Sequence, residues 1–327
     1  MRYIPFGNTG AEVSEMCLGT MMFGESIGES ESFEIMHKAF DAGVNFFDTA
    51  VAYGGEFGKT EEIVGKGIKD FRDKIFLASK IRISNDARTI AEDIDVSLAR
   101  LGTDHLDLCQ IHWPRKGMRI GEVMEALGGI VKSGKARFVG CSNYPAWVLE
   151  ASNSYARLND LAPMVSHQLP YNLLERGVEV EVLPMARTEN IAVMVYRPIA
   201  MGLLAGKYIP GEPIPDDSRA KTDKRIARWL GDYGEGILKL REFARRRGVA
   251  MVDVSVGWIR SSPAVTCPIM GVSRLSQLEK SLKAFEFTLR PEEREEVGSF
   301  FDTEVKELSG GNYGPLRRDL DLVAETG

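Results

Sequence analysis

The segment Asp41–Gly54 reads DAGVNFFDTAVAYG, and it holds the pattern that decides the fold. Gly43 stands where a helix should stop, and the apolar run Val44–Asp48 that follows has the length of a buried strand. Polar groups come directly after this run, first Asp48 itself and then Tyr53. The segment therefore predicts a helix end, a buried strand and a polar strand end in succession.

The same unit recurs along the whole chain. Eight short apolar runs can be found: Met16–Gly19, Val44–Asp48, Ile75–Ser79, Leu106–Ile111, Ala136–Gly140, Met164–His167, Ile191–Tyr196 and Ala264–Met270. Between them, apolar residues recur at helical spacing, for example in Arg88–Leu101, Gly121–Ser133 and Arg274–Phe285. Strands that alternate with helices predict a parallel sheet, and eight such units favour a closed (β/α)8 TIM barrel of the α/β class.

The rest of the chain predicts additions to this barrel. Residues 1–16 look like an N-terminal hairpin, in which Arg2–Phe6 and Ala11–Met16 flank a Gly/Asn turn. Residues 209–228 are rich in Pro, Gly, Asp and Lys, and predict a long loop after the seventh strand, while residues 301–327 form a polar tail. Because no Gly/Ser-rich or Pro-rich linker interrupts the pattern, we expect one domain over residues 1–327.

Composition excludes several classes of function. The net charge of -6 argues against a nucleic acid or an anionic membrane as partner. No stretch approaches the ~18 apolar residues of a membrane span. The cysteines are Cys17, Cys109, Cys141 and Cys267. No two of them form a C-x-x-C pair, so the sequence predicts neither a metal site nor a redox pair. Low cysteine usage fits a reducing compartment, and we expect a cytoplasmic protein.

Polar residues gather where the predicted strands end. These residues are Asp48 and Tyr53, Lys80, His112 and Trp113, Ser142 and Asn143, Gln168, Tyr196 and Arg197, and Gly271–Arg274. In a (β/α)8 barrel the active site lies at the C-terminal ends of the strands, so these groups should share one mouth.

Four of these groups suit acid–base chemistry. A tyrosine holds its proton at neutral pH because its usual pKa is about 10, and the ammonium of Lys80 is expected to lower that pKa by stabilising the phenolate of Tyr53. Asp48 would keep Lys80 charged and oriented, and a neutral His112 could donate a hydrogen bond to a carbonyl. This set is suited to proton delivery during hydride transfer.

Longer motifs around these residues resemble one family, the aldo-keto reductases. The signature segment is Asp41–Gly54, the lysine segment is Leu77–Lys80, and the histidine segment is Leu106–Pro114. The resemblance covers essentially the full chain and implies a catalytic tetrad of Asp48, Tyr53, Lys80 and His112. These are the same four residues that the strand-end argument selects.

The resemblance also implies NADP(H) as cofactor, bound without a Rossmann motif. Gly19, Thr20, Met21 and Asp48 would line the cofactor, and Ser142, Asn143 and Gln168 would hold the nicotinamide carboxamide. Tyr196 would stack on the ring. The pyrophosphate segment would comprise Arg197, Pro198, Met201, Gly202, Leu203, Gly206 and Lys207. The 2′-phosphate and adenosine site would comprise Gly271, Ser273, Arg274, Gln277 and Ser281, where an arginine and a helix N-terminus favour a phosphate.

Two positions depart from the family pattern. Arg197 stands where the family often has serine, which adds a cation near the phosphates. Ser281 stands where the family often has asparagine, which puts one adenine contact in doubt.

The substrate class implied is a small aldehyde or ketone, reduced to an alcohol. Met22, Phe23, Tyr53, His112 and Trp113 are expected to line its pocket. The sequence does not predict the particular carbonyl compound, the physiological direction or the oligomeric state.

Other interpretations stay open at this point. The chain could be an NADPH-binding regulatory or sensing subunit with little turnover, as in proteins similar to potassium-channel β subunits, or another barrel enzyme with Lys80 as a Schiff base. Taken singly, Asp48 and Lys80 would be a buried ion pair. Ser142-Asn143 would cap a helix with Pro145 in its first turn. His37, His105 and His167 are interpreted as structural.

Overall fold

The computed structural model describes residues 1–82, 87–215, 218–221 and 223–302. Its strands are β1 (Tyr3–Pro5), β2 (Glu12–Ser14), β3 (Cys17–Gly19), β4 (Phe46–Asp48), β5 (Phe76–Ile81), β6 (Leu106–Ile111), β7 (Ala136–Ser142), β8 (Met164–Pro170), β9 (Ala192–Tyr196) and β10 (Cys267–Gly271). Its α-helices are α1 (Glu29–Asp41), α2 (Lys59–Gly67), α3 (Ala87–Leu101), α4 (Ile120–Lys132), α5 (Ala146–Leu158), α6 (Val182–Thr188), α7 (Lys224–Arg247), α8 (Met251–Arg260), α9 (Leu275–Ala284) and α10 (Pro291–Ser299).

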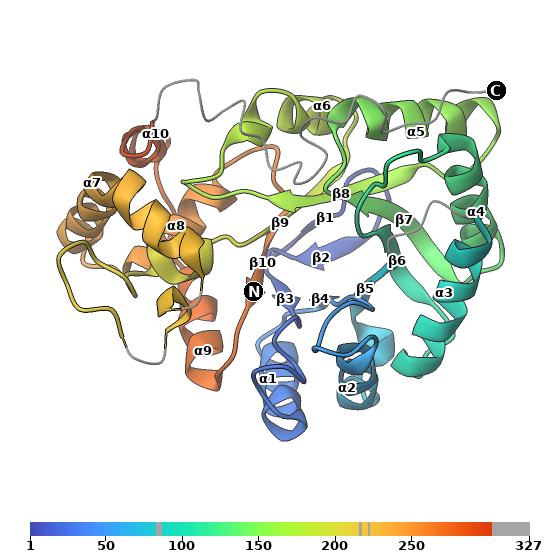
Figure 1. The fold of residues 1–327 in the computed structure, drawn as a ribbon, viewed down its shortest axis with the longest axis horizontal. Helices are drawn as coiled ribbons and strands as arrows, with labels where there is room; N and C mark the ends of the chain where they lie inside the picture. The colour runs from blue at the N-terminus through green and yellow to red at the C-terminus, as the bar shows by residue number, and fades with distance from the viewer. Residues whose placement is uncertain (83–86, 216–217, 222, 303–327) are drawn as a thin grey trace.

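Strands β3 to β10 form a closed barrel of eight strands in chain order, with β10 paired to β3. All neighbouring strands are parallel, and the register places Gly19 beside Asp48 and Asp48 beside Ala78. Figure 1 shows the strands at the centre and the helices as an outer ring. The predicted (β/α)8 barrel is confirmed, and its strand ends share one rim.

The stretch between β9 and β10 departs from the simple βα repeat. Two helices, α7 and α8, occupy it, and a short 3-10 helix, η3 (Ala200–Ala205), precedes them. The predicted loop at 209–228 is too long, because Lys224–Arg228 form the start of α7. The carboxylate of Asp223 accepts a hydrogen bond from the backbone N–H of Arg225 and caps this helix. Residues 216, 217 and 222 of the loop and 303–327 of the tail lie outside the described residues.

The predicted hairpin is present as β1 and β2 and closes the N-terminal end of the barrel. Phe6, in the segment that joins β1 to β2, is fully buried. Its ring centroid lies 5.6 Å from that of Phe46 and 4.8 Å from that of Phe76. These rings belong to an apolar cluster inside the barrel, and a larger cluster lies between the strands and the helices. No helix among the described residues has the length and apolarity needed to cross a bilayer.

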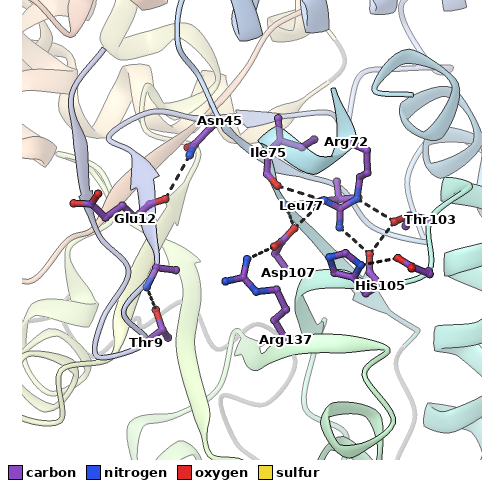
Figure 2. Close-up of polar contacts among 12 residues, drawn as sticks. Thr9, Glu12, Asn45, Arg72, Ile75, Leu77, Thr103, His105, Asp107 and Arg137 are labelled. Carbon is purple, nitrogen blue, oxygen red and sulfur yellow. Dashed lines mark hydrogen bonds and ion pairs between the residues drawn. The ribbon is translucent and has the colours of Figure 1, made fainter. Parts of the chain in front are cut away.

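A buried carboxylate ties several elements together at the start of the strands. Figure 2 shows Asp107 of β6 between the guanidinium groups of Arg72 and Arg137. Asp107 Oδ2 accepts from Arg72 at 3.0 Å and from the backbone N–H of Leu77 at 2.9 Å, and Oδ1 accepts from Arg137 at 2.7 Å. Arg72 also donates to the carbonyl of His105. This cluster links β5, β6 and β7 at the end opposite to the mouth.

Candidate active site

Three of the predicted catalytic residues are hydrogen-bonded at the mouth of the barrel. Lys80, fully buried on β5, donates its Nζ to Asp48 Oδ2 at 2.6 Å, to the carbonyl of Thr49 at 2.9 Å and to Tyr53 Oη at 3.2 Å. Asp48 is the last residue of β4, and Tyr53 lies in the loop that follows. The parallel register brings these elements side by side, since Asp48 pairs with Ala78, two residues before Lys80.

The second oxygen of Asp48 is held by two buried amides. Gln168 Nε2 on β8 donates to Asp48 Oδ1 at 2.8 Å, and Gln110 Nε2 on β6 lies 3.4 Å from the same oxygen. Gln168 was expected at the cofactor, whereas Gln110 was not predicted as a site residue. Residues two apart on a strand point to the same face. The spacing of Gln110 from His112 was therefore the signal that could have placed Gln110 in the site.

His112 stands beside the phenol of Tyr53. The two rings meet edge to face, with centroids 5.8 Å apart. Burial and the nearby ammonium of Lys80 lower the pKa of His112 to about 3. The imidazole is therefore neutral at physiological pH, as the sequence-based interpretation expected, and one of its nitrogens can donate a hydrogen bond.

The pKa of Tyr53 differs in direction from the expectation. Burial raises it, and the ammonium of Lys80, which lowers it, opposes this only in part. The sequence argument considered the neighbouring charge without the loss of hydration, which penalises the phenolate more strongly. Lys80 stays charged, because Asp48 and Tyr53 raise its pKa against the opposing effect of burial.

Asn143 and Tyr196 form a second polar pair at the rim. The hydroxyl of Tyr196 donates to Asn143 Oδ1 at 2.7 Å, and Asn143 Nδ2 donates to the carbonyl of His112 at 3.1 Å and to Ser142 Oγ at 2.9 Å. The helix cap expected at Ser142-Asn143 is wrong: Pro145 is the N-cap of α5, and Asn143, with φ 63°, bonds instead to His112, directly after β6.

Arg197 is already paired with a carboxylate. Its guanidinium donates to Glu175 Oε1 at 2.8 Å, so the extra cation expected near the phosphates is largely neutralised. Its backbone has φ 56°, and Ala200 and Met201 also have positive φ. Such strain often accompanies functional loops.

The remaining cofactor candidates lie at the ends of β3, β9 and β10. Thr20 is fully buried and donates to the carbonyl of Asp48, while Leu203 is fully buried in the core. Ser273 donates its backbone N–H to Gln277 Oε1 at 2.8 Å, at the start of α9, where Arg274 is the N-cap. Ser281 is 6% exposed. The others predicted in these segments are Gly19, Met21, Pro198, Gly202, Gly206, Lys207 and Gly271.

The predicted substrate residues differ in accessibility. Tyr53, His112 and Trp113 are partly exposed, and Met22 is 8% exposed. Phe23 is fully buried in the core, and its carbonyl accepts a hydrogen bond from the hydroxyl of Thr60. Its side chain does not reach the surface in this structure. Met21 and Phe57, in the loops after β3 and β4, are exposed by 44% and 69%.

The arrangement can deliver one proton from a phenol. Tyr53 is protonated, a fixed cation lies next to its oxygen, and a neutral imidazole stands at its edge. A phenolate formed at Tyr53 would be stabilised by Lys80, which Asp48 holds in place.

Comparisons with known proteins identify the family. The family model described as "Aldo/keto reductase family" matches residues 15–301. The chain is 36% identical to the uncharacterized oxidoreductase YrpG of Bacillus subtilis, covering 89% of this chain and 93% of YrpG. It is 32% identical to a probable voltage-gated potassium channel subunit beta of Arabidopsis thaliana, covering 87% and 91%.

A solved structure extends the likeness to the fold. The thermostable aldo-keto reductase Tm1743, crystallised with the inhibitor epalrestat, aligns with a TM-score of 0.75 and 28% identity, over 92% of this chain and 100% of that one. A family model that covers most of the chain, a matching barrel and a phenol–ammonium–carboxylate cluster at its mouth all agree: this chain belongs to the aldo-keto reductase family.

Proposed function

We propose that this protein is an NADP(H)-dependent carbonyl reductase in which Tyr53 protonates the oxygen of an aldehyde or ketone. One observation carries the proposal: the ammonium of Lys80 lies 3.2 Å from the hydroxyl of Tyr53 and 2.6 Å from Asp48. Family membership supports oxidoreductase chemistry on small carbonyl compounds.

Each residue has a distinct task in this proposal. Tyr53 holds a proton at neutral pH and passes it to the substrate oxygen. Lys80 stabilises the resulting phenolate, and Asp48 keeps the ammonium charged and in place. His112, neutral because of its lowered pKa, donates a hydrogen bond to the same oxygen and orients the carbonyl.

The residues at the rim fit a nicotinamide cofactor, which would supply the hydride. The amide oxygen of Gln168 can accept from the carboxamide, since Asp48 uses only its Nε2. Asn143 Oδ1 accepts one hydrogen bond, from Tyr196, and can accept a second from the same carboxamide. Tyr196 offers a ring face beside them. The N-terminus of α9, with Arg274 as its N-cap, can hold a 2′-phosphate, which favours NADP over NAD.

The pocket and the setting of the enzyme are also proposals. Met22 and Trp113 would contact the substrate beside Tyr53 and His112, and we leave buried Phe23 out of this set. Four free, buried cysteines fit a reducing, cytoplasmic setting. We treat residues 1–327 as one functional unit.

Replacement of the proposed acid tests the function directly. Tyr53→Phe removes the proton but keeps the ring, so NADPH oxidation with a panel of aldehydes should fall about 100- to 10,000-fold, the usual contribution of a general acid. NADPH binding, followed by tryptophan fluorescence, should persist. Tyr155→Phe is the matched control, because Tyr155 of α5 is also partly exposed and its hydroxyl donates to Glu125. Unchanged turnover in Tyr53→Phe would remove Tyr53 from the mechanism.

A second candidate is an NADPH-binding regulatory subunit, because two relatives are named as probable voltage-gated potassium channel subunits beta. The two functions differ in turnover. A wild-type protein that binds NADPH tightly and oxidises it no faster with aldehydes than without them would favour the regulatory role.

A further inference from the structure

A buried carboxylate outside the catalytic cluster connects the elements that carry Lys80 and Tyr53. Glu61, in the first turn of α2, is fully buried. Its Oε1 accepts a hydrogen bond from the hydroxyl of Ser79 at 2.7 Å, and its Oε2 forms an ion pair with Arg100 of α3 at 3.5 Å. Burial raises the pKa of Glu61, and Ser79, Ser97 and Arg100 oppose this effect.

The contact with Ser79 fixes α2 to the strand that carries the ammonium. Ser79 lies on β5 immediately before Lys80. Alternate residues of a strand point to opposite faces, so Ser79 faces the helices while Lys80 faces the barrel interior. A displacement of α2 relative to β5 would therefore have to break the bond between Glu61 and Ser79.

The contact with Arg100 fixes the loop that carries Tyr53. Arg100 packs against Gly58 so closely that a Cβ at this glycine would lie 2.2 Å from the guanidinium carbon. Gly58 is the N-cap of α2 and closes the loop by donating its N–H to the carbonyl of Val51 at 2.7 Å.

The same loop is seated on the first turn of α2. A Cβ at Gly54, next to Tyr53, would lie 2.7 Å from the hydroxyl of Thr60. The loop, the first turn of α2 and Glu61 therefore form one packed unit. Glu61 joins this unit to β5 through Ser79.

We infer that Glu61, together with Ser79 and Arg100, is a positioning residue that sets the distance between Tyr53 and Lys80. This rests on the proposed roles of Tyr53 and Lys80. The two groups belong to different elements, and their direct contact is a single bond of 3.2 Å between flexible side chains. The loop is also bonded to β5 through the backbone, since Thr49 donates its N–H to the carbonyl of Ala78 at 2.9 Å and Val51 donates to the carbonyl of Lys80 at 3.2 Å. Glu61 adds a side-chain connection between these elements, behind the strand.

A carboxylate is a costly choice for this place in the fold. Burying an ion pair costs several kcal/mol in hydration, and apolar residues of similar size often give equal or higher stability. The carboxylate of Glu61 accepts a directional hydrogen bond from Ser79 and attracts the guanidinium of Arg100 by charge, which constrains geometry in a way that an apolar side chain does not.

The test is Glu61→Gln, which keeps size and shape but places an amide N–H2 toward Arg100 or Ser79. Misplacement of catalytic groups by about 1 Å can cost on the order of 100-fold in rate. We expect kcat to fall about 10- to 100-fold, with KM and the NADPH dissociation constant unchanged. Glu15→Gln is the matched control, since Glu15 is also a buried glutamate, paired with Arg260 at 2.6 Å beside the hairpin.

A second measurement is independent of turnover. Hydrogen–deuterium exchange should become faster in Glu61→Gln over residues 51–58, where the N–H of Gly58 is bonded to Val51, and should stay unchanged there in Glu15→Gln. If Glu61→Gln does not fold, Ser79→Ala, which removes only the hydroxyl, takes its place with the same expectations.

The outcomes separate the two proposals. Faster exchange at 51–58 together with reduced kcat supports the positioning role. Wild-type exchange or wild-type kcat in a folded variant overturns it. A wild-type protein without any turnover would instead defeat the proposed function, and faster exchange at 51–58 would still support the structural link.

Discussion

At the scale of single residues, burial decides which groups of the site are charged. Burial raises the pKa of Tyr53 and lowers that of His112 to about 3, so both stay neutral at physiological pH. Lys80 is the exception, because Asp48 accepts from its ammonium at 2.6 Å. The site therefore presents two neutral proton donors beside one fixed cation.

A buried histidine outside the site makes stability depend on pH. His167 on β8 is fully buried, and burial lowers its pKa to about 4, which the backbone of Tyr144 opposes only in part. In the unfolded chain the usual pKa is about 6.5, so the unfolded state binds a proton first as the pH falls. The stability contribution is complete above about pH 6.5 and is lost on acidification toward about pH 4.

Replacement of this ring should flatten the acid side of the stability curve. The difference between the pKa of His167 in the unfolded and folded states corresponds to about 3 kcal/mol in the free energy of unfolding. We expect the free energy of unfolding in urea to fall more steeply between about pH 6.5 and pH 4 in the wild type than in His167→Leu. Parallel curves for wild type and His167→Leu would contradict this prediction.

At the scale of elements, the cluster around Asp107 should matter for stability and not for turnover. Asp107→Ala leaves Arg72, which is 11% exposed, without its carboxylate. Removing one partner of a buried pair costs roughly 3–5 kcal/mol, so the urea midpoint should fall strongly. The residual kcat of folded enzyme should stay near the wild-type value, because the cluster lies at the strand starts.

The other arginine of that cluster supplies the control. Arg137 is 52% exposed, and exposed pairs contribute about 0–1 kcal/mol, so Arg137→Ala should lose little stability. Equal losses for Asp107→Ala and Arg137→Ala would show that burial does not set the cost.

The strands could be predicted from sequence because each is a short apolar run that ends in polar residues. Val44–Asp48 predicts β4 to within two residues. Side-chain partners between distant segments could not be predicted this way. Asn143 resembles a helix cap by its position before Pro145, yet it bonds to the carbonyl of His112. Glu61 has no local signal of function, and Gln110 has only its spacing of two residues from His112, since their partners come from other strands and helices.

At the scale of the whole molecule, the barrel separates two tasks between its ends. The C-terminal ends of the strands carry Tyr53, Lys80 and His112, whereas the N-terminal ends carry the hairpin and the Asp107 cluster. A ligand at the mouth binds only the folded chain, so it should stabilise the entire barrel against unfolding. Thermal unfolding thus reports cofactor choice without any assumption about the substrate.

NADPH should raise the unfolding temperature more than NADH does at the same concentration, because the two differ only in the 2′-phosphate. A ligand at about 100 times its dissociation constant stabilises the folded state by about 2.7 kcal/mol, and a weaker ligand does so less. In Arg274→Ala, the rise in unfolding temperature with NADPH should be no larger than the rise with NADH. Arg119→Ala is the matched control, since Arg119 is the N-cap of α4 as Arg274 is of α9. Equal shifts with both cofactors in the wild type would refute the preference for NADP. They would leave the proposed role of Tyr53 intact, because the phenol and the proposed 2′-phosphate site belong to different strand ends.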